Sequence, residues 1–341
     1  MNNSHFGQDH EAREQLSSAG GDRRAGPTLS LENIESGSEF SVGYSHAQYA
    51  ASFQQFGELR RLPRSEGLIL IRQIPEAPQF RDAVGLYPFI CCKNWRELAV
   101  DIQALGEEVV TFSVVTDPFG SYDEELLRSC FQIVRPFKSH FVTDFQHPLN
   151  SFLSRHHRRH ARNALSEMTV EILDGPQVCV REWDALYENL AKRHGIQGIR
   201  RFSEEAFMHQ LQTPGTLVFR AAVDGKAVGI DIWYIENEVA YNHLVAVSDL
   251  GYQLHANYAL QMTALEYLKD RVRFASFGGV AGLDGETQDG LYRFKRGWTN
   301  STRLTYFCGS ILNTAVYAEL FSSCTPSNND FFPAYRRGRF D

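Results

Sequence analysis

The stretch "TLVFRAAVDGKAVGIDIWYIENEVAYNHLVAV", residues 216–247, carries the clearest fold signal in the chain. Two polar dipeptides, Asp224-Gly225 and Glu236-Asn237, divide it into runs rich in apolar and β-branched residues. Asp-Gly between alternating apolar runs is a strong signal for a tight hairpin turn. The stretch therefore predicts an antiparallel meander of three strands.

Helices and further strands are predicted on both sides of this meander. In order, the apolar spacing predicts a helix over 147–167, a strand over 168–173, a helix over 181–195, the meander, a helix over 252–271, strands over 274–279 and 302–308, and a helix over 311–320. Alternating strands and helices earlier in the chain predict a first α/β lobe over 36–146, followed by a second lobe over 147–321. The two ends, 1–35 and 322–341, lack a periodic apolar pattern, so we expect a disordered tail and an extended tail.

Composition limits the class of protein. The 341 residues fit two domains of ordinary size, and 43% hydrophobic with 22% charged residues is typical of a soluble globular protein. The net charge of −7 means that contact with nucleic acid or phosphate requires a local basic patch. The six cysteines form no CxxC pair, which is typical of reduced thiols in the cytosol. Without a signal-peptide pattern or an apolar run of about 18 residues, we expect a cytoplasmic protein that does not span a membrane.

The helix predicted over 147–167 provides such a basic patch. Arg155, Arg158, Arg159 and Arg162 fall at i, i+3, i+4 and i+7, so they share one face. Arginine binds phosphate oxygens in a bidentate manner, which suits a nucleotide-linked substrate, the pyrophosphate of CoA or a tRNA backbone. The alternative is a basic face that only contacts water.

Two histidines on the same helix have the spacing of metal ligands. His156 and His160 lie at i and i+4, but "HHRRH" has arginine where a metalloprotease helix has glutamate. No third ligand is indicated. We therefore predict that these histidines line a core or a site, and that the protein has no metal centre.

Three segments resemble those of a known superfamily. They are "SRHHRRHARNAL" (154–165), "ANYALQMTALEYLKDRVRFASFGG" (256–279) and "GLYRFKRGW" (290–298). The order of predicted elements is that of the GNAT acyltransferase fold, once clearly and once, upstream, in a weaker form. With two such lobes in tandem, the chain resembles the FemAB-like branch of that superfamily, the peptidoglycan-bridge aminoacyltransferases. The resemblance implies an α/β fold of two GNAT-like lobes, with mixed sheets that contain the meander and are flanked by helices.

The resemblance also implies a reaction. Such a protein would move an acyl or aminoacyl group from a carrier to an amine, forming an amide by direct attack in a cleft between the lobes. The carrier, aminoacyl-tRNA or acyl-CoA, would be a co-substrate, and no cofactor would be bound permanently. The acceptor would be a small-molecule or cell-wall-precursor-like amine. The alternative is a non-catalytic protein on the same scaffold that recognises a nucleotide-sugar or a lipid-linked partner.

One departure from the GNAT pattern bears on the carrier. "GYQLHANYAL" stands where GNAT enzymes have an (Arg/Gln)-x-x-Gly-x-(Gly/Ala) loop that binds the CoA pyrophosphate at a helix N-terminus. Gln253 fits this pattern, but Ala256 and Tyr258 do not. Gln253 and Asn257 remain candidates for phosphate binding because a helix N-terminus attracts anions. The departure favours aminoacyl-tRNA slightly over acyl-CoA.

The motif "GLYRFKRGW" places adjacent cations between aromatic residues. Lys295 and Arg296 lie between Phe294 and the pair Gly297-Trp298. Acyl transfer passes through a tetrahedral oxyanion, and a cation held by packed neighbours stabilises that charge. We expect Lys295 to face the oxyanion and Arg296 to bind phosphate. The alternative is a surface pair of cations beside buried aromatic residues.

The third strand of the meander offers two further candidates. A period of two places Tyr241, His243, Val245 and Val247 on one side of the strand. In the fold that the chain resembles, this strand lines the cleft. His243 would relay a proton from the attacking amine, and Tyr241 would bind the substrate or protonate the leaving group. A structural histidine with its hydrogen bonds satisfied is the alternative.

Overall fold

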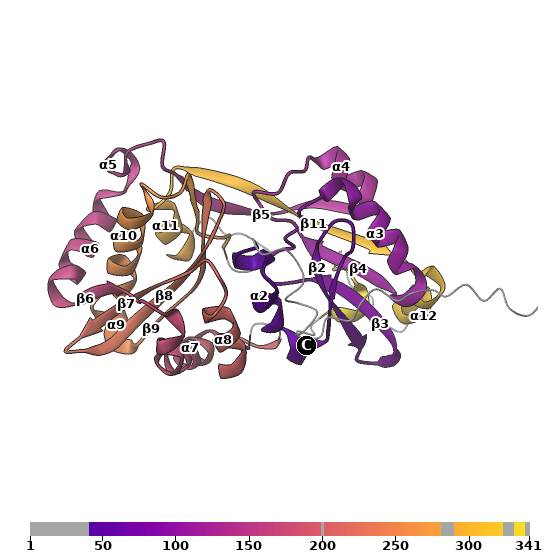
Figure 1. The fold of residues 1–341 in the computed structure, drawn as a ribbon, viewed down its shortest axis with the longest axis horizontal. Coiled ribbons are helices and arrows are strands. Elements are labelled where there is room, and N and C mark those ends of the chain that lie inside the picture. Colours follow the sequence, from indigo (N-terminus) through magenta and orange to yellow (C-terminus); the bar gives the residue numbers. More distant parts are fainter. Residues whose placement is uncertain (1–40, 199–200, 281–289, 323–330, 338–341) are drawn as a thin grey trace, which may run out of the picture.

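The computed structural model describes residues 41–198, 201–280, 290–322 and 331–337. Two lobes lie side by side and share one sheet of eleven strands in the order β1-β2-β3-β4-β11-β5-β10-β9-β8-β7-β6 (Figure 1). The tail predicted over 1–35 lies outside the described residues. Within the described ranges, no helix is long and apolar enough to cross a membrane.

The elements follow the predicted alternation. The strands are β1 (Glu58–Arg61), β2 (Leu68–Ile74), β3 (Ala77–Gly85), β4 (Thr111–Val115), β5 (Ile133–Asp144), β6 (Thr169–Ile172), β7 (Thr216–Val223), β8 (Lys226–Glu236), β9 (Val239–Val247), β10 (Phe274–Ser276) and β11 (Ser301–Ile311). The α-helices are α2 (Ala47–Ala51), α3 (Leu98–Leu105), α4 (Glu124–Cys130), α5 (Leu149–Phe152), α6 (Arg155–Glu167), α7 (Val180–His194), α8 (Glu204–Leu211), α9 (Asp249–Gln253), α10 (Ala256–Leu268), α11 (Gly290–Arg296) and α12 (Thr314–Ser322). The sequence interpretation missed the short elements α2, β1 and α8.

The meander is confirmed as the antiparallel strands β7, β8 and β9. Asp224 and Gly225 both have positive φ, at 49° and 77°, as the predicted tight turn requires. The register shifts where Ile232 faces Leu244 while Trp233 faces Asn242, which leaves His243 as an extra residue in β9. The bulge reverses the alternation, so the prediction that Val245 and Val247 share a side with Tyr241 and His243 is wrong.

Two of the predicted helices are interrupted. The helix predicted over 147–167 divides into α5 and α6, because Ser154 begins α6 as its N-cap and accepts a hydrogen bond from the His157 N–H at 3.1 Å. The helix predicted over 252–271 divides into α9 and α10 at His255, which has a φ of 58°. A left-handed residue breaks the helical hydrogen-bond pattern, and periodicity alone does not reveal it.

The two lobes exchange strands across the predicted boundary. β11 follows the second lobe in sequence, yet it lies between β4 and β5 and pairs antiparallel with both. β5 comes from the first lobe and pairs with β10 of the second. α12 packs near Ile74 and Val110. Residues 301–321, predicted with the second lobe, therefore belong by contact to the first, because strand pairing rather than chain order decides their position.

The described part of the C-terminal tail is packed rather than extended. The Tyr335 hydroxyl and Thr111 Oγ1 are 2.7 Å apart, and Arg336 donates from Nε to Asp82 Oδ2 at 2.8 Å. Both members of this ion pair are buried. The extended tail predicted over 322–341 is thus corrected for residues 331–337, whose aromatic and arginine side chains find partners on β3 and β4.

A candidate active site between the lobes

A cavity opens where two neighbouring parallel strands separate. β9 and β10 pair in parallel up to Tyr241 opposite Ser276. Beyond that point β9 continues through Asn242 and His243, while the chain after β10 turns away through Phe277 and two glycines. All of these residues line a cavity of about 410 Å³. Among the described residues, β9 therefore has no ladder partner on the β10 side beyond Tyr241.

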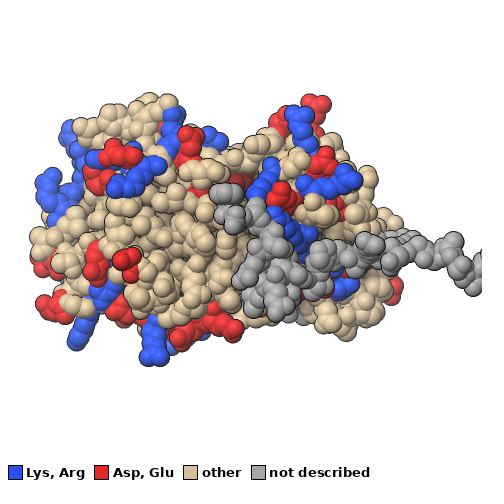
Figure 2. Space-filling view, in the orientation of Figure 1, with Lys and Arg blue, Asp and Glu red and all other residues tan. Residues whose placement is uncertain are grey.

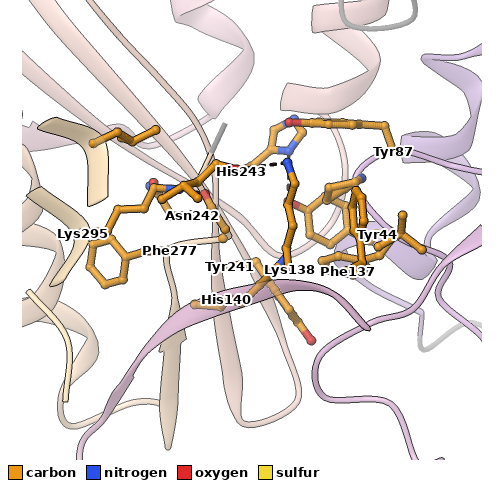
Figure 3. A pocket seen from close by; sticks show the side chains of 18 residues that line it. Tyr44, Tyr87, Phe137, Lys138, His140, Tyr241, Asn242, His243, Phe277 and Lys295 are labelled. Atoms are coloured by element: carbon orange, nitrogen blue, oxygen red, sulfur yellow. Dashed lines mark hydrogen bonds between the residues drawn. The ribbon is translucent and has the colours of Figure 1, made fainter. Parts of the chain in front are cut away.

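Both lobes supply the walls of the cavity. Figure 3 shows Lys295 and Phe277 on one side and Tyr44, Tyr87 and Phe137 on the other. Because β5 crosses from the first lobe to pair with β10, it also places Lys138 and His140 in the lining. The cavity is therefore a site that neither lobe forms alone.

Two lysines converge on the segment after β10. Lys295 on α11 donates from Nζ to the carbonyl oxygen of Gly279 at 2.5 Å, and Lys138 donates to that of Val280 at 3.0 Å. Burial, followed by the charge of Lys138, lowers the pKa of Lys295 to about 8. Lys295 therefore carries its charge in most molecules at neutral pH, and the structure places it in the lining of the cavity.

Gly297 and Trp298 fix α11 against α6. A Cβ on Gly297 would lie 2.1 Å from His157 Cε1, so only glycine leaves room for that ring. The ring donates from Nε2 to the Phe294 carbonyl at 2.9 Å, and its centroid lies 4.7 Å from that of the fully buried Trp298. The aromatic residues around Lys295 thus anchor its helix, while the lysine itself turns to the cavity.

His140 is a site residue that the sequence interpretation missed. Its ring is 7% exposed, and neither ring nitrogen has a hydrogen-bond partner within the described part of the chain. Burial, followed by the charges of Lys295 and Lys138, lowers its pKa to about 3, so the ring is neutral. The sequence did contain a signal for this residue, because Lys138 and His140 are two positions apart in a predicted strand and therefore share one face of it.

His243 lines the cavity, but its polar atoms are already engaged. Its Nδ1 lies 3.1 Å from the Tyr44 hydroxyl and its Nε2 lies 3.2 Å from Gln210 Oε1. An amide oxygen only accepts, so Nε2 carries the proton and Nδ1 accepts from the tyrosine. Burial lowers the pKa of His243 to about 3. These contacts are those of a structural histidine.

Tyr241 is likewise engaged. Its hydroxyl donates a hydrogen bond to the Asp117 carboxyl group and lies 3.2 Å from Oδ1 and 3.3 Å from Oδ2. Burial raises the pKa of Asp117 to about 6. The cavity therefore meets the ring of Tyr241, whose hydroxyl is bound to the first lobe.

Asn242, between these two residues, is held by a buried carboxyl group. Asp231 accepts hydrogen bonds from Asn242 Nδ2 at 2.5 Å, Trp233 Nε1 at 2.7 Å and Gln261 Nε2 at 3.0 Å. Its side chain is wholly buried, and burial raises its pKa to about 7. The network fixes the amide of Asn242 at the edge of the cavity.

The predicted phosphate-binding residues lie apart from the cavity. Lys and Arg side chains gather at the left edge of Figure 2, where Figure 1 has α5 and α6. Arg155, Arg158, Arg159 and Arg162 form no ion pair with any described carboxylate. Arg158 and Arg162 line a second cavity of about 450 Å³ between α6 and α10. None of the four lines the cavity between the lobes.

The remaining candidates divide between surface and interior. Arg296 and Gln253 are exposed, and neither lines the cavity between the lobes. Asn257, in the first turn of α10, has a buried Oδ1 without a hydrogen-bond partner in the described ranges. The structure therefore does not join these residues with Lys295 into one cluster.

The histidines of α6 form a ring cluster. The ring centroids of His156 and His160 are 4.2 Å apart, and those of His160 and His255 are 4.5 Å apart. Among the residues that the structure describes, no group of three or more His, Cys, Asp or Glu side chains is arranged to hold a metal ion. His160 thus contacts His156 on its own helix and, edge-to-face, His255 at the α9–α10 junction.

Several solved structures share the fold of this chain. The structure of FemX matches 80% of this chain and 93% of its own, with 14% sequence identity and a TM-score of 0.57. The chain has the FemX fold. L-PGS from Bacillus licheniformis shares it, with 12% identity, coverage of 87% of this chain and 96% of its own, and a TM-score of 0.58. The C-terminal domain of a putative lysylphosphatidylglycerol synthetase from Agrobacterium fabrum matches at 12% identity and a TM-score of 0.54, covering 81% of this chain and 89% of its own.

The FemX fold confirms the prediction of two tandem GNAT-like lobes in the FemAB-like arrangement. No protein-family model and no curated protein matches the sequence. At identities of 12–14%, these comparisons establish the fold of this chain but not its substrates. The substrates have to be inferred from the residues of the site.

Proposed function

We propose that this chain is a transferase that moves an acyl or aminoacyl group from a carrier to an amine in the cavity between the lobes. The observation that carries the proposal is the Lys295 ammonium at the opening between β9 and β10. A carbonyl seated there meets the partly buried ammonium of Lys295 beside the separating strands. A cation held in this way stabilises an oxyanion.

The reaction that fits is direct attack. The amine nitrogen bonds to the carbonyl carbon, the carbonyl electrons move to oxygen, and Lys295 faces the resulting negative charge. Collapse breaks the ester or thioester bond, and the proton lost by the nitrogen leaves with the carrier hydroxyl or thiol. His140, rather than His243, accepts a hydrogen bond from the amine, because both nitrogens of His243 already have partners.

The carrier is aminoacyl-tRNA or acyl-CoA, and the α6 arginines favour a polyanion. Arg155 and Arg159 are exposed and have no carboxylate partner in the described part, so phosphate groups would meet little competition. Aminoacyl-tRNA is our first choice because Ala256 and Tyr258 depart from the GNAT pyrophosphate pattern. The acceptor is a small-molecule or cell-wall-precursor-like amine.

A non-catalytic binding protein on the same scaffold is the competing function. To separate the two, the purified chain is incubated with charged tRNA and, separately, with acyl-CoA, each with a panel of amines. Mass spectrometry then detects amide products. We expect amide formation with one carrier class. Saturable carrier binding without product for every amine would overturn the transferase and favour the binding protein.

A further inference from the structure

A buried carboxyl group orders the polar side chains behind one wall of the cavity between the lobes. Asp231 Oδ2 accepts hydrogen bonds from Trp233 Nε1 at 2.7 Å and from Gln261 Nε2 at 3.0 Å. Its other oxygen, Oδ1, accepts from Asn242 Nδ2 at 2.5 Å. Of these four residues, only Asn242 lines the cavity (Figure 3). Asp231 therefore reaches a ligand in the cavity only through Asn242.

The contact with Asp231 decides which way the amide group of Asn242 faces. An ionised carboxylate only accepts hydrogen bonds, so it pairs with the amide nitrogen and leaves Oδ1 on the other side of the group. Burial raises the pKa of Asp231 to about 7, so this carboxyl group is ionised in most molecules at pH 8.5. No described residue donates to Asn242 Oδ1, and this atom is not among the buried polar atoms that lack a partner. The oxygen is therefore an accessible acceptor with a fixed direction.

An acceptor oxygen in this lining suits one partner in the proposed reaction. A neutral amine offers N–H donors and a lone pair, and an N–H held by an oxygen leaves the lone pair free to meet the carbonyl carbon. A carbonyl oxygen has no N–H or O–H to donate, so the acyl group does not pair with Asn242 Oδ1. The amine is the partner that fits.

We infer that Asn242 Oδ1 binds an N–H of the amine that attacks in this cavity, and that Asp231 is the positioning residue that turns this oxygen outward. The inference rests on the proposed function for its reaction. The binding of an N–H group is testable without turnover.

A single isosteric change should reverse the direction of the amide. The indole N–H of Trp233 only donates, so in Asp231→Asn the new amide has to place its oxygen opposite Trp233 and Gln261. Its nitrogen then faces Asn242, whose amide turns its own oxygen to meet it. The variant should therefore present an N–H donor to the cavity in place of an acceptor, without changing the shape of the lining.

The test uses two probes of equal size and no net charge at pH 8.5, aniline as an N–H donor and pyridine N-oxide as an acceptor. Titrations of the full chain followed by NMR give both affinities. In Asp231→Asn the affinity ratio of aniline to pyridine N-oxide should fall about tenfold, because one hydrogen bond is lost and another is gained. Asp270→Asn is the matched control, since that aspartate is exposed and does not line the cavity. It should leave the ratio unchanged.

A double-mutant cycle separates the reversed amide from the mere loss of a nearby charge. In an Asn242→Ala background, Asp231→Asn should leave the probe ratio unchanged, because the side chain that transmits the effect is absent. A fall of the same size in that background would overturn the inference. So would an unchanged ratio in Asp231→Asn, or wild-type protein that does not bind aniline. Thermal melts check that each variant is folded.

The inference and the proposed function fail separately. A reversed probe ratio without amide formation from any carrier contradicts only the transferase. Amide formation in which Asp231→Asn leaves the KM for the amine unchanged contradicts only the role of Asn242.

Discussion

Lys295 is the side chain on which the proposed chemistry depends. If its ammonium meets the oxyanion only in the transition state, Lys295→Ala should lower kcat by about 10²–10³-fold with little change in KM. Desolvation also lowers the pKa of this lysine to about 8, so the wild-type rate should fall as pH rises above 8 and the charge is lost. Lys295→Arg keeps its charge throughout this range, so it should restore part of the activity and abolish the alkaline decline.

A pH–rate profile from pH 6 to 10 at saturating substrate checks both expectations. A profile of Lys295→Arg that declines above pH 8 like the wild type would assign the ionisation to another group. Loss of affinity with kcat preserved in Lys295→Ala would make the lysine a binding group rather than a catalytic one.

Asp231 gives a prediction about stability. Burial raises its pKa to about 7, far above that of an exposed carboxyl group in the unfolded chain. The folded state thus binds a proton that the unfolded state has released, and this stabilisation is present at low pH and lost as pH rises from about 4 through 7. Asparagine cannot ionise. The free energy of unfolding of Asp231→Asn, relative to wild type, should therefore increase between pH 4.5 and 7.5.

Urea denaturation at several pH values measures this trend. The absolute offset between the two proteins reflects the changed hydrogen bonds to Trp233 and Gln261, so only the slope with pH tests the idea. Parallel curves would show that Asp231 is ionised in the folded protein across the range.

Helix α11 depends on a contact that a single methyl group would destroy. A Cβ at Gly297 would lie within the His157 ring, which in turn accepts a hydrogen bond from Ser154 at 2.7 Å. Gly297→Ala should destabilise the fold by about 1–3 kcal/mol, the usual cost of overpacking a filled site. Gly290→Ala is the matched control on the same helix, because a Cβ there meets nothing within 4 Å. Equal melting temperatures for both variants would contradict the packing argument.

Local sequence patterns predicted part of the site. They failed for residues whose position depends on strand register or on the pairing of distant strands. The Asp224-Gly225 turn identified the meander, and the motif around Lys295 identified one wall of the cavity. The role of His140 depends on β5 entering the second lobe beside β10, a pairing between distant segments that has no local signal. The sequence analysis also missed the bulge at His243, because an extra residue in one strand can be recognised only from the register with the neighbouring strand.

The exchange of strands makes the folding of the two lobes interdependent. A fragment covering residues 41–146 lacks β11, so β4 and β5 would lose the strand that lies between them. We expect this fragment to show no cooperative thermal transition, whereas the full chain should unfold in one transition by circular dichroism and fluorescence. Joining residues 301–337 to the fragment through a flexible linker should restore cooperative unfolding. A fragment that melts cooperatively without them would restore the domain boundary at 146.

The same pair of strands determines how substrates reach the cavity. β5 and β11 contain 12 and 11 residues, and they remain hydrogen-bonded to each other from one lobe into the other (Figure 1). Enzymes that close by hinge bending concentrate their motion in a few loop residues between domains. Here a hinge would have to break a ladder of backbone hydrogen bonds, so the width of the cavity is preorganised. Within the described part of the chain this ladder offers no hinge for closure, so we expect substrate binding to be a single step limited by entry.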